Sequence, residues 1–123
     1  MTEYHLGGME EKFADLIWAH APVPSGELVK ITAEELDWKK STTYTVLRRL
    51  CEKGLFVNEN GVVRALMNKN EWKSMQSESF VEDTFGGSLP SFLAAFTSRK
   101  KLTEDEIEAL RKMIEDAGNI PGK

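Results

Sequence analysis

The chain has 123 residues, a formal net charge of −4 and 41% apolar residues. That length and apolar content support one domain, or a small domain with a helical extension, and exclude wholesale disorder. No apolar run reaches the roughly 18 residues that cross a bilayer, and the N-terminus lacks the basic and apolar regions of a secretory signal. A single cysteine, Cys51, excludes an internal disulfide and a multi-thiolate metal site. We therefore expect a cytoplasmic protein without membrane insertion.

The charge is unevenly distributed along the chain. Residues 1–37 carry eight acidic and two basic side chains, whereas residues 38–70 carry seven basic and two acidic ones. Residues 71–123 carry ten acidic and seven basic side chains. A polyanion responds to a concentrated basic patch rather than to the total charge, so the middle third is the segment that suits nucleic acid.

Apolar residues at helical spacing predict two helices at the start of the chain. The first spans about residues 8–20 and ends before Pro22, because proline cannot continue the helical hydrogen bonds. The second spans about residues 26–36 with Ser25 as its N-cap. Because β-branched residues are weaker helix formers, the pair Ile31-Thr32 leaves open an earlier end for this helix.

A third helix and a hairpin follow. The helix is predicted from Lys39 to Lys53, with Gly54 closing its C-terminus. The spacing then changes to that of strands at residues 55–58 and 62–67, which flank the dipeptide Asn60-Gly61, a strong hairpin signal. Three short helices followed by a hairpin predict a winged helix-turn-helix, a mainly α fold with a small β wing.

The remaining residues predict a helical tail. One helix spans about residues 71–85 and breaks at Gly86-Gly87, and Ser88 caps a short second helix. The segment Thr103–Glu106 is a capping box that opens the last helix. The chain thus divides into a winged-helix domain over residues 1–70 and a helical region over residues 71–123.

The tail carries large apolar side chains but no interior of its own, so we expect it to form its core with a second copy of the chain. The alternative is that the tail packs back on the winged helix. The apolar residues assigned to the dimer contact are Phe80, Phe85, Leu89, Phe92, Leu93, Phe96, Ile107, Leu110 and Ile114.

One face of the predicted third helix is suited to DNA. At about 100° per residue its apolar stripe lies opposite a polar face of hydroxyls and arginines, and only one acidic residue, Glu52, interrupts the bases of this segment. Hydroxyl groups and arginines at such positions contact phosphates and base edges. The candidate DNA-binding residues in this segment are Lys39, Lys40, Ser41, Thr42, Thr45, Arg48, Arg49 and Lys53. The ring of Trp38 either packs near the sugar-phosphate backbone or joins the core.

Other function classes have little support in the sequence. There is no Ser-His-Asp set, no glycine-rich phosphate loop and no histidine at metal-ligand spacing, so we expect no enzyme, no metal and no cofactor. Cys51 follows the inward Leu50 and is expected to act as a small buried apolar residue. Two alternatives stay open: a winged helix that binds protein rather than DNA, and a small hydrolase or redox protein that uses Cys51.

The order and spacing of these motifs resemble the penicillinase-repressor (BlaI/MecI/CopY) family over about residues 6 to 117. The residues that carry the resemblance lie in all three helices, the Asn-Gly hairpin and the tail. They are Leu6, Glu10, Phe13, Trp18, Ser25, Leu28, Trp38, Thr42, Thr45, Leu47, Arg49, Leu50, Lys53, Gly54, Ser79, Phe80, Phe85, Gly87, Ser88, Leu89, Leu102, Thr103, Glu106, Ile107 and Leu110.

The resemblance implies a homodimeric repressor that binds a dyad-symmetric DNA operator, with the third helix in the major groove. The matching contact positions are Trp38, Ser41, Thr42, Thr45 and Arg49. In the wing the family favours a basic residue directly after the turn glycine, and this residue contacts a phosphate. This chain has Val62-Val63 at that place, and Arg64 is expected to make the phosphate contact instead.

The resemblance also concerns how such repressors are released. In antibiotic-responsive members a membrane metalloprotease pathway leads to cleavage next to an Asn-Phe bond, and the corresponding pair here is Ala95-Phe96, without the asparagine. A membrane metalloprotease sensor is therefore a partner that the resemblance implies. The cluster of paired cysteines of copper-responsive members is absent from this chain.

Overall fold

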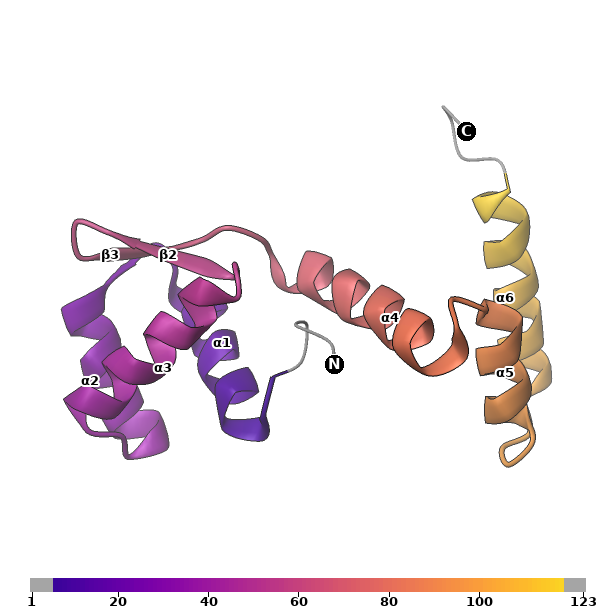
Figure 1. Ribbon diagram of the computed structural model, residues 1–123, viewed down its shortest axis with the longest axis horizontal. Helices are drawn as coiled ribbons and strands as arrows, with labels where there is room; N and C mark the ends of the chain where they lie inside the picture. Colours follow the sequence, from indigo (N-terminus) through magenta and orange to yellow (C-terminus); the bar gives the residue numbers. More distant parts are fainter. Residues whose placement is uncertain (1–5, 119–123) are drawn as a thin grey trace.

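The structure is a computed structural model that describes residues 6–118. Figure 1 shows a winged helix-turn-helix at one end and helices of the tail at the other. The helices are α1 (Gly8–His20), α2 (Ser25–Leu36), α3 (Lys40–Glu52), α4 (Lys69–Phe85), α5 (Leu89–Thr97) and α6 (Glu104–Ala117). The strands are β1 (Val23–Pro24), β2 (Phe56–Glu59) and β3 (Val62–Ala65). The predicted mainly α fold with a β wing is confirmed.

The hydrophobic core lies between α1, α2, α3 and the sheet. Its largest fully buried side chains include Phe13 and Ile17 from α1, Leu28 from α2, Leu50 from α3 and Phe56 from β2. Within a helix the buried residues recur at helical spacing, as Phe13 and Ile17 do on α1 and Val46 and Leu50 do on α3, so each of these helices buries one face. The core therefore fixes the orientation of α3 relative to the β wing.

The wing is a three-stranded antiparallel sheet with the strand order β1-β3-β2. Its turn has Asn60 at φ 54° and Gly61 at φ 80°, the two positive φ angles that a type I′ hairpin turn requires. The strand β1 was not predicted, because two residues that include a proline carry no strand pattern. It exists because Val23 pairs with Val63 and Pro24 pairs with Val62 of β3.

Two features of α2 differ from the prediction. Pro24 rather than Ser25 occupies the N-cap, and Ser25 is the first helical residue. An earlier end at Ile31-Thr32 is wrong, because α2 continues to Leu36. The hydroxyl of Thr32 donates to the carbonyl of Val29 at 3.1 Å and is buried, so packing outweighs the weak helix propensity of these residues.

The tail leads away from the winged helix (Figure 1). The helix α4 begins at Lys69, one residue before the predicted end of the winged-helix domain at residue 70. The side chain of Trp72, in the first turn of α4, is buried. The helices α5 and α6 line one pocket together, to which Phe92 and Leu110 contribute. They lie at the far end from the winged helix and do not pack back on it (Figure 1). No helix in the described part of the chain has the length and apolar character of a membrane span.

Candidate nucleic-acid interface

The helix α3 presents two chemically different faces. Thr43, Val46, Leu47 and Leu50 are buried in the core. The remaining side chains of the candidate interface on this helix project away from the core and are exposed: Lys40, Ser41, Thr42, Thr45, Arg48 and Arg49. The structure therefore brings hydroxyls and cations together on the accessible face of one helix.

The cations on this face are not neutralised by neighbouring carboxylates. Within residues 6–118, no ion pair forms at Lys39, Lys40, Arg48 or Arg49. The first turn of α3 carries no acidic residue, and its free N–H groups add the positive end of the helix dipole. This surface favours an extended anion such as a DNA backbone.

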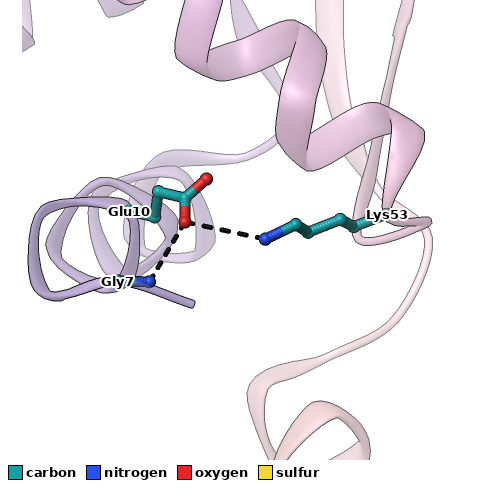
Figure 2. A network of polar contacts seen from close by, with 3 residues as sticks. All are labelled: Gly7, Glu10 and Lys53. Atoms are coloured by element: carbon teal, nitrogen blue, oxygen red, sulfur yellow. Dashed lines mark hydrogen bonds and ion pairs between the residues drawn. The ribbon is translucent and has the colours of Figure 1, made fainter. Parts of the chain in front are cut away.

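Lys53 occupies a different environment from these cations. Its ammonium group lies 3.6 Å from Oε1 of Glu10, and the same carboxylate oxygen accepts the backbone N–H of Gly7 at 3.0 Å (Figure 2). The side chains of Lys53 and Glu10 are only 30% and 19% exposed. Lys53 therefore ties the end of α3 to the start of α1.

Two other candidate residues also have contacts within the chain. The ring of Trp38 is half-buried and lies 5.0 Å from the ring of Phe13, so it joins the core rather than projecting freely. The guanidinium of Arg64 on β3 lies 3.9 Å from a carboxylate oxygen of Glu59 on β2, and both side chains are largely exposed. Arg64 stays accessible to an anion, whereas Trp38 has a structural contact already.

Hydrogen bonds connect the wing, α2 and α3. The backbone N–H of Ser25 donates to the carbonyl of Gly61 at 2.8 Å. The hydroxyl of Tyr44 on α3 donates to Oγ of Ser25 at 3.1 Å. These two bonds fix the wing turn relative to the candidate DNA-binding face. Sequence reasoning missed the role of Tyr44 and the contact of Glu10 with Lys53, because neither long-range contact leaves a local pattern.

Cys51 lines a cavity of about 420 Å³ between α3 and the wing. Burial raises the pKa of its thiol above the usual value, although a backbone hydrogen bond from Asn58 acts in the opposite direction. A raised pKa leaves less of the reactive thiolate at neutral pH, which does not favour a catalytic role. Among the described residues no cluster of histidine, cysteine and carboxylate side chains could hold a metal ion.

The tail exposes five of the nine apolar residues assigned to the dimer contact, whereas Phe85, Phe92, Leu93 and Leu110 are half-buried. None of the residues of α5 or α6 is buried. Leu89 is 62% exposed and Ile114 is 66% exposed, whereas Phe85 and Phe92 are half-buried and contact each other with ring centroids 5.7 Å apart. Phe85 and Phe92 thus also join α4 to α5 within one chain.

Ala95 and Phe96, the pair that matches the family's cleavage position, lie inside α5. Phe96 is 42% exposed, and its ring is 6.2 Å from that of Phe92. The peptide bond between them is therefore accessible but helical.

Comparisons with known proteins agree with this architecture. A methicillin resistance regulatory protein MecI of Staphylococcus aureus is 24% identical over 115 residues, which cover 90% of this chain and 94% of that protein. The corresponding MecI of Staphylococcus epidermidis has the same identity and coverage. The penicillinase repressor of Bacillus licheniformis is 27% identical over 118 residues, which cover 93% of this chain and 92% of that protein.

These relatives match nearly the whole chain, from the winged helix through the tail. The family model described as penicillinase repressor matches residues 6–116. The predicted resemblance is thereby confirmed, and the chain belongs to the penicillinase repressor family.

Proposed function

We propose that this protein is a DNA-binding transcriptional repressor that acts as a homodimer on a dyad-symmetric operator. The observation that carries the proposal is the exposed face of α3, which holds Arg48, Arg49 and the hydroxyls of Ser41, Thr42 and Thr45. No carboxylate of the described residues 6–118 forms an ion pair with these arginines. Relatives named as repressors over almost the full chain support it. A repressor of this kind works in the cytoplasm, where bacterial DNA is, and needs no catalytic site or cofactor.

In this function the exposed end of α3 enters the major groove. Arginine can form two hydrogen bonds with guanine or with a phosphate, and the hydroxyls reach base edges or phosphates. Lys39, Lys40 and Arg64 provide further phosphate contacts at the flanks. Lys53 contributes mainly to the stability of the domain, because its ammonium group is already paired with Glu10.

Dimerisation follows from the exposed apolar surface of the tail. Phe80, Leu89, Phe96, Ile107 and Ile114 are each at least 42% exposed in one chain. Such a surface is costly in water, and a second copy of the tail provides a complementary apolar surface. Two winged helices joined in this way match two half-sites related by a two-fold axis.

The mode of release is part of the same proposal. Cleavage through a membrane metalloprotease sensor, next to Phe96, would separate α6, with Ile107, Leu110 and Ile114, from the winged helix and α4. Because a protease binds its substrate in an extended form, the last turns of α5 would first have to unwind. The absence of a buried residue in α5 lowers the cost of that step in a single chain.

The test is DNA binding as a function of salt. We expect log K for a duplex selected from random sequences to fall steeply with log salt, with a slope of about −0.9 per phosphate contacted. Arg49→Ala should weaken this binding by about 1–3 kcal/mol. The matched control Lys12→Ala removes a charge from the exposed surface of α1 and should bind as the wild type does. A flat salt dependence, with a protein partner recovered in stoichiometric amount, would indicate the protein-binding alternative.

A further inference from the structure

The attachment of α4 to the winged helix is separate from the candidate DNA interface. It centres on residues 67–72, which we name the α4 root. The ammonium group of Lys69 lies 2.7 Å from Oδ1 of Asp15 on α1. The indole N–H of Trp18, also on α1, donates to the carbonyl of Met67 at 2.9 Å. Trp72 is buried at 3% exposure, so an ion pair, a hydrogen bond and apolar packing all hold the α4 root.

The ion pair joins one position on α4 to one position on α1, whereas apolar packing does not restrict the orientation of α4 in this way. Oδ1 of Asp15 is buried, and a buried carboxylate oxygen without a partner is costly. The ammonium group of Lys69 at 2.7 Å compensates the charge of this oxygen, although the contact does not have the geometry of a hydrogen bond. Because both side chains are 44% exposed, the pair is partly screened by solvent, and its role is to select an orientation rather than to add much stability.

The rest of α4 transmits that orientation to the tail. The helix start is fixed by Asn68, whose side chain accepts the N–H of Glu71 at 2.8 Å while the carboxylate of Glu71 accepts the N–H of Asn68. The helix then runs for 17 residues and ends at Gly86, with φ 59°. No glycine or proline interrupts Lys69–Phe85, so the helix is a continuous connection of about 26 Å at about 1.5 Å per residue.

A small rotation at the α4 root has a large effect at the far end of α4. A tilt of roughly 10° displaces the end of a helix of about 26 Å by about 4 to 5 Å. The rise of one base pair is about 3.4 Å, so such a tilt corresponds to more than one base-pair step. In a symmetric dimer both copies contribute, and the separation of the two α3 helices changes accordingly.

We infer that Asp15 and Lys69 are positioning residues that determine which half-site spacing the dimer accepts. The inference depends on the proposed function as a dimeric DNA-binding protein, but neither residue has to touch DNA. Figure 1 shows α4 as the connection between the winged helix and the helices α5 and α6. An α4 root held in one orientation makes the dimer reject operators whose half-sites are displaced by one base pair.

The test compares spacing preference among variants with intact half-site binding. The probes are a duplex selected from random sequences by the wild-type protein, one isolated half-site of that duplex, and versions with one base pair added or removed between the half-sites. One base pair shifts the half-sites by about 3.4 Å and rotates them by roughly 35°, so the wild type should bind the altered duplexes at least about tenfold more weakly.

The variants Asp15→Ala and Lys69→Ala should reduce this preference to about threefold or less, while affinity for the isolated half-site stays unchanged. The matched control is Lys73→Ala, which removes the same charge from an exposed position one turn further along α4 and should keep the wild-type preference. The charge exchange Asp15→Lys with Lys69→Asp restores the ion pair in the opposite sense, and it should restore the preference.

A second measurement does not depend on DNA. Spin labels at the exposed positions Glu34 on α2 and Glu78 on α4, in a Cys51→Ser background, report the distance between the winged helix and α4. The distance distribution should broaden in Lys69→Ala and stay as in the wild type in Lys73→Ala. An unchanged distribution in Lys69→Ala would overturn the positioning role.

The outcomes separate this inference from the proposed function. Operator binding with an unaltered spacing preference in Asp15→Ala and Lys69→Ala overturns the inference alone, as does a wild type that binds all spacings equally. Failure of the wild type to bind any duplex overturns the proposed function, and the inference with it.

Discussion

The hydroxyl oxygens of Thr32 on α2 and Thr43 on α3 lie 2.6 Å apart in the buried contact between these helices. Both side chains are at most 1% exposed, so water is not available to replace the bond. The hydroxyl of Thr32 donates its one proton to the carbonyl of Val29, so the hydroxyl of Thr43 is the donor in the bond between the two threonines. This buried bond fixes the candidate DNA-binding helix against the helix that precedes it.

Thr43→Val should lower the free energy of unfolding by about 0.5–1.5 kcal/mol, because it keeps the shape of the side chain but removes one buried hydrogen bond, while the Thr32 hydroxyl keeps its bond to Val29. The double variant with Thr32→Val should lose less than the sum of the two single changes. Urea unfolding followed by circular dichroism measures both. The control Thr42→Val changes an exposed hydroxyl on the same helix and should stay within about 0.5 kcal/mol of the wild type. Additive losses would contradict a direct coupling.

Lys53→Ala should affect stability more than DNA binding. Removal of the pair with Glu10 should lower the free energy of unfolding by about 0.5–1 kcal/mol. The slope of log K against log salt should change by less than about 0.3, whereas loss of a phosphate contact changes it by about 0.9. Glu10→Gln is the matched variant and should show a similar loss of stability. A full change of slope in Lys53→Ala would return Lys53 to the DNA interface.

Ile114→Asp should convert the dimer into monomers. Ile114 is 66% exposed in one chain, and a carboxylate buried between two tails loses its hydration. We expect the dissociation constant measured by sedimentation to rise at least about tenfold, with the helix content largely unchanged. Lys112→Asp, on the opposite side of α6 at about 100° per residue, is the control and should remain dimeric. Equal sedimentation of both variants would place the interface elsewhere.

The start of α6 should depend on pH through Glu106. The backbone N–H and the hydroxyl of Thr103 form hydrogen bonds in the capping box that hold the pKa of the Glu106 carboxyl below its usual value. Because the folded pKa is lowered, this contribution is present above the pKa of the unfolded chain and is lost as the pH falls through the folded pKa. An NMR titration should show the Glu106 pKa rising in Thr103→Ala. Because alanine keeps the backbone N–H that donates to Glu106, an unchanged value would exclude only the Thr103 hydroxyl as a cause.

The sequence predicted the parts of the fold that depend on local patterns. The helix α1, the Asn60-Gly61 turn and the caps Ser88 and Thr103 were found because spacing, backbone conformation and capping chemistry act over a few residues. The strand β1 was missed because only its pairing with β3, about 40 residues away, makes it a strand.

The candidate site was predictable as a face but not residue by residue. Helical spacing placed Thr45, Arg48 and Arg49 on the exposed side of α3, as the structure shows. A run of bases does not reveal which cation meets a distant carboxylate, so the pairing of Lys53 with Glu10 could not be foreseen. The contact between Trp38 and Phe13 is likewise a product of folding across 25 residues.

The short strands of the wing also limit how the protein meets other chains. Strand edges attract further strands because they carry unpaired N–H and carbonyl groups. At one edge of this sheet β1 has only two residues, and Pro24 has no N–H to donate. At the other edge β2 ends in the exposed polar residues Asn58 and Glu59. Neither edge provides a continuous hydrogen-bonding template, so the wing resists edge-to-edge aggregation with other chains.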